Sequence, residues 1–411
     1  MTVQTPQVRF NPFSADFRRD PYTAYRHLRE TKPVHRTMGM WVLTRHADVK
    51  QVLRDRTFGA GLIPQLVRQH AARYGHDDVG QLERLGEKSL VFTDNPDHAR
   101  LRGIVNRVFT APAVATLRPR IAERAEELLD RAWAGGGMDA VADLAAQLPV
   151  NVMCDWMALP DSLRERVGQW THDIRFLLEP GLMKGEDFAY VCEVVATFVR
   201  ALDEVLASRR AEPGDDLISQ LLAVRTTSGD RLTDEELAFV CIMCFVAGNE
   251  TTKSLIGNAL LALLQHPEQD ERLRREPELV PRMVDEALRY DCPLQQTKRL
   301  ATRDVEVGGQ QIRTGDQVLL CMGAANRDPE VFARPDEFDI TRDARGHLAF
   351  GHGMHGCLGG LLAELQAGVV FETLYRRAER LELAGDELEW QDHSFIVRGL
   401  QRLPVVVRGA R

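Results

Sequence analysis

Hydrophobic residues recur mainly at helical spacing along this chain. Strand-like patterns are confined to four short segments, at residues 40–44, 305–307, 317–321 and 403–407. Apolar positions three and four residues apart predict the helices, which cover residues 21–31, 46–54, 98–109, 114–134, 141–158, 161–178, 185–210, 233–265, 279–291 and 358–377. Residues 59–95 have mixed polarity and no stable period, which predicts a long mobile loop with no more than a short helix inside it. The pattern therefore predicts a mainly α fold with a minor β portion.

Composition excludes several classes of protein. The 411 residues are 44% hydrophobic and 27% charged, without a linker-like stretch, which predicts a single soluble domain over residues 1–411. A net charge of −8 argues against a nucleic-acid binder. Seven cysteines without paired spacing fit a reducing cytoplasm. We expect no signal peptide or membrane anchor, because residues 1–20 lack the plan of a signal sequence and the apolar run 237–248 is too short to span a bilayer.

A glycine-rich loop, residues 350–360, carries a single cysteine, Cys357, directly before a predicted helix. The positive end of a helix dipole favours a thiolate, and a thiolate is a ligand for a soft metal centre. Gly351, Gly353 and Gly356 allow the backbone to approach a large flat group. This pattern predicts one sulfur ligand to haem iron. The alternative is a zinc site made by Cys357, His352 and His355, although no second Cys/His cluster is nearby to complete it.

The predicted helix 233–265 contains a polar interruption in its apolar core. It begins with a capping box formed by Thr233 and Glu236, and roughly 33 residues at about 1.5 Å each would cross the whole domain. In its middle, residues 247–252 read Ala-Gly-Asn-Glu-Thr-Thr. A buried Glu250 requires a partner or water, and Thr251 can bond a preceding carbonyl and bend the helix. The motif indicates either a simple helix bend or a proton-delivery groove, in which Thr251 holds a ligand or water and Glu250 connects it to solvent.

Two pairs of charged residues have helical spacing. Glu286 and Arg289 are three residues apart with apolar neighbours, and they form either a surface salt bridge or a buried structural network. His98 and Arg102 are one turn apart, which is typical of a solvated basic face. If haem is present, the same pair is suited to its propionates.

Together these motifs resemble those of the bacterial soluble cytochromes P450, over essentially the whole chain. The resemblance implies that Cys357 is the axial haem ligand and that the 247–252 stretch activates oxygen. It places Glu286 and Arg289 in a structural network with a downstream arginine, Arg327 or Arg334. The implied haem contacts are His98, Arg102, Arg299 and His355 at the propionates, with Ala247, Gly248, Phe350 and Gly359 as further cofactor-binding residues.

The resemblance also implies the fold and the activity. The fold would be the triangular, mostly helical cytochrome P450 fold, with haem b between the central helix and the helix that follows Cys357. The activity would be that of a monomeric, cytoplasmic haem-thiolate monooxygenase, with Glu250 and Thr251 as catalytic residues. It would use O2 and electrons from a ferredoxin and its reductase, with Arg100, Arg107, Arg376 and Arg377 as candidates for the docking patch.

Two alternatives to a monooxygenase remain open. One is a haem-thiolate isomerase, lyase or peroxygenase that needs no redox partner, which the presence of Glu250 and Thr251 disfavours. The other is a non-catalytic binder or sensor.

The substrate pocket is expected to draw on the 59–92 and 174–190 regions and on a mainly apolar set of residues: Met243, Val246, Ala247, Leu294, Gln295, Phe395, Ile396 and Val397. Gln295 is the one polar handle in this set. Such a pocket fits a medium-sized or large apolar molecule with some oxygens. Bacterial relatives of this kind often modify polyketides, macrolides or terpenoids, so we expect hydroxylation or epoxidation of such a secondary metabolite.

Overall fold

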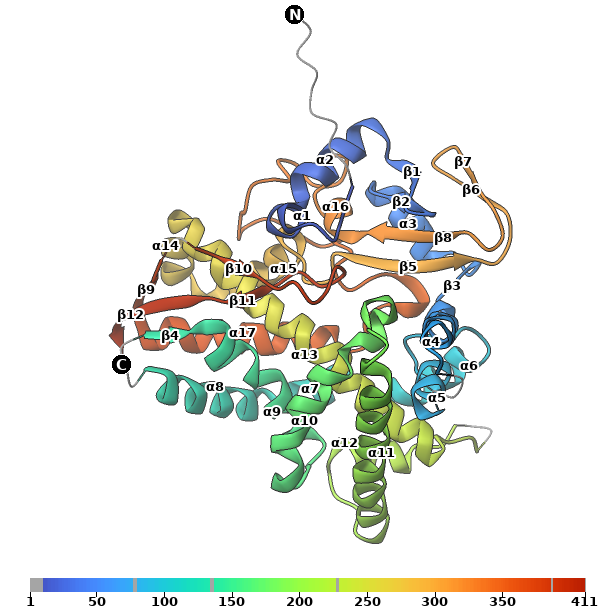
Figure 1. Ribbon diagram of the computed structural model, residues 1–411. Coiled ribbons are helices and arrows are strands. Elements are labelled where there is room, and N and C mark those ends of the chain that lie inside the picture. Colours follow the sequence, from blue (N-terminus) through green and yellow to red (C-terminus); the bar gives the residue numbers. More distant parts are fainter. Residues whose placement is uncertain (1–9, 77–79, 134–136, 227–228, 386, 411) are drawn as a thin grey trace, which may run out of the picture. The chain divides into compact units, whose positions relative to one another are not determined.

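The computed structural model describes residues 10–410 except 77–79, 134–136, 227–228 and 386 (Figure 1). Residues 1–9, part of the segment in which we expect no signal sequence, lie outside this description. The chain forms two compact units, and each is assembled from separate stretches. We call residues 1–59, 258–357 and 387–402 the sheet unit, and residues 60–257, 358–386 and 403–411 the helical unit. The expectation of a single domain stays a prediction.

The sheet unit is built on a five-stranded sheet in the order β1-β2-β8-β5-β3. The strands are β1 (Val34–Thr37), β2 (Met40–Leu43), β8 (Gln317–Cys321), β5 (Gln296–Ala301) and β3 (Phe58–Gly59). Strands β2 and β8 pair in parallel, and the other neighbours are antiparallel. Along β8, Val318 and Leu320 belong to one buried cluster and Leu319 and Cys321 to another, because alternate side chains point to opposite faces. The central strand is therefore covered on both sides.

Helices and two small strand pairs complete the sheet unit. The pairs are β6 (Val305–Val307) with β7 (Gln310–Ile312) and β10 (Glu389–Trp390) with β11 (Leu400–Arg402). The helices are α1 (Ala15–Arg19), α2 (Pro21–Thr31), α3 (His46–Arg54), α14 (Pro267–Arg275), α15 (Val280–Tyr290) and α16 (Met322–Ala325), with 3₁₀ turns at Pro277–Leu279 and Gly353–His355.

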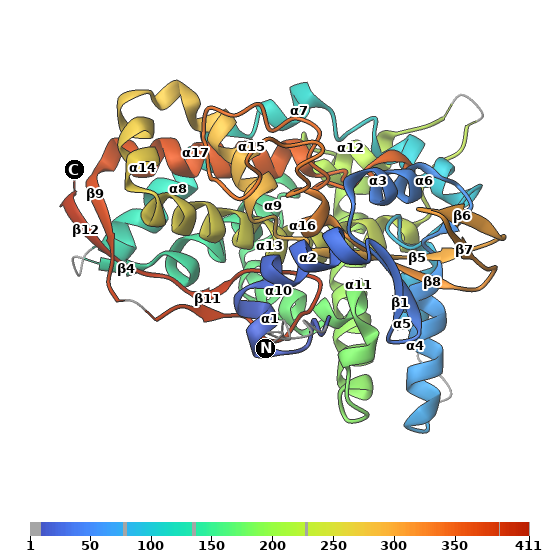
Figure 2. The same ribbon diagram turned by 90° about the horizontal axis from the view of Figure 1, so that it is seen from above.

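The helical unit contains most of the long helices. They are α4 (Leu62–Arg73), α5 (Gly80–Lys88), α6 (Asp97–Val105), α7 (Ala111–Ala115), α8 (Arg118–Trp133), α9 (Gln147–Trp156), α10 (Asp161–Asp173), α11 (Asp187–Ala211), α12 (Leu217–Ala223), α13 (Asp234–Gln265, which enters the sheet unit at Asn258) and α17 (Gly360–Arg377). A π-helix covers Ala140–Ala145, and 3₁₀ turns cover Arg175–Leu178 (η2) and Pro180–Leu182 (η3). Helices α8 and α17 pack side by side (Figures 1 and 2). A three-stranded sheet joins β4 (Gly137–Asp139), β12 (Pro404–Ala410) and β9 (Ala378–Leu383).

The expectation of a long loop at residues 59–95 is wrong, because this region contains the two helices α4 and α5. Each buries only a narrow apolar side, such as Leu82 and Leu85 of α5. Their charged residues face each other, since Arg68 of α4 forms an ion pair with Glu83 of α5 at 2.7 Å. Because charged residues of α4 and α5 contact each other, polar and apolar positions do not separate cleanly onto two sides of either helix. The helical period of each is therefore hard to recognise in the sequence.

The beginning of α13 confirms the predicted capping box. The Thr233 N–H donates to Glu236 Oε2 at 2.9 Å, and the Glu236 N–H donates to Thr233 Oγ1 at 3.2 Å. Among the described helices, α13 alone is long and apolar enough to cross a membrane, but 67% of its most apolar window is buried inside the protein. This is typical of a core helix of a soluble protein.

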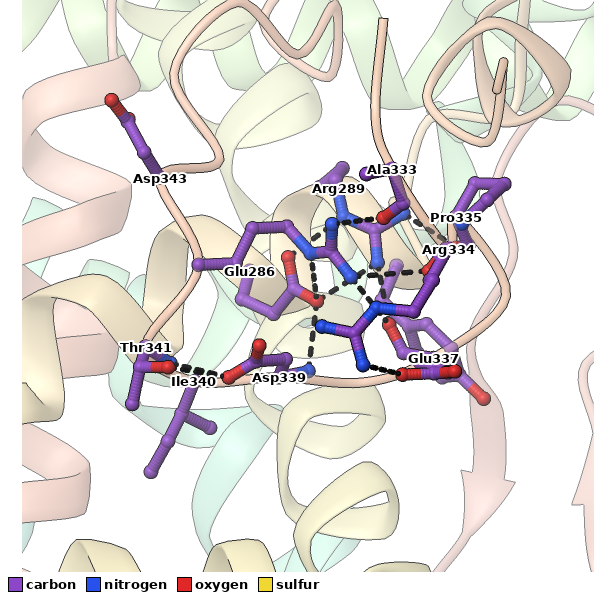
Figure 3. A network of polar contacts seen from close by, with 12 residues as sticks. Glu286, Arg289, Ala333, Arg334, Pro335, Glu337, Asp339, Ile340, Thr341 and Asp343 are labelled. Carbon is purple, nitrogen blue, oxygen red and sulfur yellow. Dashed lines mark hydrogen bonds and ion pairs between the residues drawn. The ribbon is translucent and has the colours of Figure 1, made fainter.

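The Glu286–Arg289 pair of α15 is a buried network and not a surface salt bridge (Figure 3). Both side chains have 0% exposure, and two N–H···O bonds of 2.7 and 2.8 Å join them. Arg289 also donates to the carbonyls of Asn326, Pro335 and Glu337. Asn326 in turn accepts a 2.6 Å bond from the Leu348 N–H, so the network reaches the beginning of the glycine-rich loop.

The downstream arginine that joins Glu286 and Arg289 is Arg342, so the expectation of Arg327 or Arg334 is wrong. Arg342 Nε lies 3.2 Å from Glu286 Oε1. Arg327 is instead stacked between the rings of Tyr22 and Tyr290, at 3.5 and 4.0 Å from their centroids. Arg334 is exposed and pairs with Glu337, and only its carbonyl accepts from Arg342.

Glu286→Ala is expected to lower the free energy of unfolding by about 3–5 kcal/mol, because it leaves Arg289 charged and buried without its carboxylate. Asp16→Ala is the matched control, since the Asp16–Arg19 pair has the same spacing but exposed side chains, and it should cost under about 1 kcal/mol. Urea unfolding followed by circular dichroism measures both. Equal losses in the two variants would contradict a structural role for the buried network.

Candidate functional site

The loop that ends at Cys357 is closed by backbone hydrogen bonds within the sheet unit. The Cys357 N–H donates to Phe350 O at 2.8 Å, and the Gly351 N–H donates to Leu348 O at 2.8 Å. Gly353 has φ +74°, and a Cβ there would lie 2.7 Å from Leu53 O, so both conformation and space require glycine. The loop is therefore held against α3 and presents Cys357 at its end.

Cys357 is the one exposed cysteine among the seven, all of which are present as thiols. Burial raises the pKa of Cys154 and of Cys244 to about 12, which keeps these thiols protonated and chemically inert. Helix α17 begins at Gly360, with Gly359 as its N-cap. Cys357 therefore precedes the helix by two more residues than the sequence pattern predicts, and the loop backbone, more than the helix itself, positions the sulfur.

The predicted cofactor-binding residues belong to both units. The sheet unit holds Arg299, Phe350, His355 and Cys357, and the helical unit holds His98, Arg102, Ala247, Gly248 and Gly359. Arg299 lies on β5, is 8% exposed and donates to Lys298 O at 2.8 Å. His98 and Arg102 lie on α6 at the expected one-turn spacing, and His98 is 2% exposed. Their contact with a cofactor stays a prediction.

The polar stretch of α13 has the contacts that its residue types predict. Thr251 Oγ1 donates to Ala247 O at 2.8 Å, four residues back. Glu250 is mostly buried, with 14% exposure, and forms an ion pair with Lys253 one turn later. The partner that Glu250 was expected to need is therefore Lys253. Lys253 follows Glu250 by three residues, and this helical spacing is a sequence signal from which the pair could have been predicted.

In the sheet unit, four predicted pocket residues come together where Leu294 and Val397 form an isolated antiparallel bridge. The Gln295 N–H donates to Ile396 O at 2.8 Å. The Gln295 side chain is 3% exposed, and its Nε2 donates to Tyr22 Oη and Cys292 O. Both of its amide hydrogens are thus used inside the protein. Phe395 packs against Phe13, with ring centroids 4.9 Å apart.

In the helical unit, the predicted pocket residues Met243 and Val246 are buried on α13, and Ala247 is half-buried. The role of both groups in binding substrate stays a prediction.

The arginines expected to form a docking patch are engaged within the helical unit. Arg100 pairs with Glu236, Arg376 and Arg377 pair with Glu126, and Arg107 donates to a backbone carbonyl. The charges of Arg100, Arg376 and Arg377 are therefore largely neutralised, whereas Arg107 keeps its charge.

A second group of basic residues, Lys50, Arg54 and His352, was not predicted from the sequence. His352 of the glycine-rich loop has its pKa lowered by burial and then by the charges of Lys50 and Arg54 on α3. In the described part of the chain, neither Lys50 nor Arg54 forms an ion pair. Two like charges at i, i+4 on one helix are unfavourable for the helix itself, and this signal could have revealed them.

Comparisons with known proteins assign the chain to a family. The model of the family described as Cytochrome P450 matches residues 170–398. Cytochrome P450 107B1 of Saccharopolyspora erythraea is 38% identical over 403 residues, which cover 96% of each chain. The chain belongs to the cytochrome P450 family.

Further matches agree with this assignment. The 6-deoxyerythronolide B hydroxylase of the same organism is 36% identical, covering 96% of this chain and 98% of that one. The crystal structure of P450BioI with an acyl carrier protein carrying hexadec-9Z-enoic acid has a TM-score of 0.87 at 34% identity, covering 96% of this chain and all of that one. The fold is thus the P450 fold, and the chain is a cytochrome P450 monooxygenase of the bacterial type.

Membership of this family implies a haem bound through a cysteine thiolate, and the residues present fit that group. Cys357 is the exposed thiol, and it ends a loop that glycine alone can form at Gly353. Arg299 and His98 are buried donors of the kind that carboxylates require.

Proposed function

We propose that this P450 inserts one oxygen atom of O2 into a medium-sized or large, mainly apolar natural product, by hydroxylation or epoxidation. Haem b is the proposed cofactor, and Cys357 would supply the thiolate that binds it. When bound, a thiolate-ligated haem supplies the iron centre at which O–O cleavage is favoured. The observation that carries the proposal is the acid–hydroxyl pair Glu250–Thr251 on α13, with both contacts described above.

Glu250 and Thr251 have the properties required for proton delivery. The Thr251 hydroxyl donates its hydrogen to Ala247 O, so its oxygen lone pairs stay available to accept a bond from water or ligand. Glu250 is held by Lys253 and keeps 14% of its surface exposed, so it can exchange protons with solvent. Glu250 therefore collects protons, and the neighbouring hydroxyl directs them to the reacting oxygen.

The remaining cofactor contacts follow from residue chemistry. We propose that His98, Arg102, Arg299 and His355 hold the two propionates, because carboxylates form strong charge-assisted bonds with such donors. Ala247, Gly248, Phe350 and Gly359 are proposed as further cofactor contacts.

The substrate class rests on a relative and on the pocket residues. The relative named 6-deoxyerythronolide B hydroxylase has a hydroxylation of that compound as its activity. In this chain Met243, Val246, Leu294 and Val397 offer apolar surface, and the Gln295 amide hydrogens are already used. These residues support a polyketide, macrolide or terpenoid as substrate.

We propose that a ferredoxin, reduced by its own reductase, is the electron donor. We also propose that the enzyme is a monomer and is located in the cytoplasm. Ferredoxin-type donors are acidic, and a basic patch guides such a partner electrostatically. We define the α3 patch as Lys50, Arg54 and His352. We favour it over Arg100, Arg376 and Arg377 because its two cations form no ion pair in the described part of the chain. We favour it over Arg107 because it contacts the Cys357 loop.

Thr251→Ala is expected to lower the product formed per O2 consumed several-fold, because it removes the hydroxyl that directs protons to the reacting oxygen. Thr252→Ala, at the adjacent buried hydroxyl, is the control and should retain coupling. Both are measured with a compound that shifts the haem spin state, in the presence of ferredoxin and reductase. Turnover without reductase that ignores Thr251→Ala would instead support a peroxygenase or isomerase.

Charge reversal at the α3 patch, in the double variant Lys50→Glu/Arg54→Glu, is expected to lower kcat/KM for the ferredoxin by about tenfold. The loss should shrink at high salt, because screening weakens the attraction in the unchanged protein. Arg73→Glu, at an exposed cation of α4, is the control. An unchanged kcat/KM in the double variant would place the donor elsewhere.

A further inference from the structure

Arg175 is a half-buried cation at the beginning of η2, directly after α10. Its guanidinium carbon lies 4.3 Å from the centroid of the Phe176 ring, within the distance of a cation–π contact. Its Nη1 donates to His172 O. This bond uses an N–H of Nη1, and the N–H groups along the Nε–Nη2 edge remain to be accounted for.

Among the residues that the structure describes, that edge has no protein partner. Nε is buried without an acceptor, and in the described part of the chain no carboxylate lies within ion-pair distance of the guanidinium. The Nε–Nη2 edge carries two parallel N–H groups, which is the geometry that binds a carboxylate through two bonds. A buried N–H without an acceptor is costly, and Nε has almost no accessible surface, so an oxygen from outside the protein completes it only when the neighbouring side chains move aside.

The acids around Arg175 do not fill this role. Glu250 exerts the largest Coulombic effect on it, followed by Asp173, Asp187 and Glu179, yet burial outweighs all four and lowers the pKa of Arg175. Glu250 is paired with Lys253. Asp173 accepts from Tyr190 Oη at 2.7 Å, and Asp187 accepts from the Lys184 N–H at 2.8 Å. The charge of Arg175 thus lacks a contacting counterion, and the Glu250 stretch of α13 lies near enough to act on it.

We propose that Arg175 is the anchor for a carboxylate on the substrate, bound through its Nε–Nη2 edge. This deepens the proposed function and rests on it, since Glu250 marks the part of α13 where oxygen chemistry is proposed. The substrate is then an apolar molecule with a free acid group, and a thioester on a carrier protein would lack the group that Arg175 binds.

The test compares an acid with its methyl ester in two apolar probes, dodecanoic acid and lithocholic acid. Calorimetry measures the dissociation constants, and the spin-state shift reports whether the probe reaches the haem. We expect at least one acid to bind about tenfold or more tightly than its ester, since the anchor forms a charge-assisted bond with the acid only. Arg175→Met should remove that preference by weakening the acid alone, and Arg175→Lys should restore part of it.

Arg166→Met is the matched control, because Arg166 is exposed and stacks on Trp170 with its guanidinium carbon 4.4 Å from the ring centroid. It removes the same charge and should leave the preference intact. The proposal is overturned if acids and esters bind equally, if neither acid binds, or if the preference survives Arg175→Met. Carbon monoxide spectra of the same samples separate this failure from failure of the proposed function, because a thiolate-type spectrum with no acid preference removes only the anchor.

Discussion

The buried pair between Glu286 and Arg289 is the constraint on which the cysteine side of the site depends. An arginine with 0% exposure is tolerable only if all of its N–H groups are used, and here Glu286 and three backbone carbonyls use them. Those carbonyls belong to residues 326–337, a stretch with little regular structure. The bonds from Arg289 hold this stretch in place. Through Asn326 and Leu348 the same constraint reaches the loop that ends at Cys357.

The distribution of charge partners distinguishes structural cations from those that can act on another molecule. Arg289, Arg342, Arg100 and Arg377 all contact carboxylates of their own unit, and they hold its segments together. Lys50, Arg54 and Arg175 have no such contact in the described chain. The first two are near the cysteine loop, where an acidic electron donor is proposed to dock, and the third is under the influence of Glu250. The two groups of cations carry the same charge and differ only in whether a carboxylate of the protein contacts them.

Local motifs of this chain were predictable from sequence, and contacts between distant segments were not. The Thr233–Glu236 capping box and the Thr251–Ala247 hydrogen bond join residues three or four apart, so the helical period alone reveals them. Arg342 is far from Glu286 in sequence and belongs to no periodic element, and nearby arginines were therefore mistaken for it. Helices α4 and α5 were missed for a related reason, because Arg68 and Glu83 satisfy each other across two helices. Arg175 was included only as part of the 174–190 region, because the lack of a carboxylate contact at its guanidinium can be recognised only in the structure.

The central claim is that Cys357 supplies a thiolate to haem iron, and the difference spectrum of the reduced protein with carbon monoxide tests it most directly. The account predicts a strongly red-shifted Soret band for the unchanged chain. Cys357→Ser should lose this band, while Cys192→Ser, at a partly exposed cysteine of α11, should retain it. A spectrum typical of imidazole-ligated haem in the unchanged chain, or a red-shifted band that survives Cys357→Ser, would contradict the account.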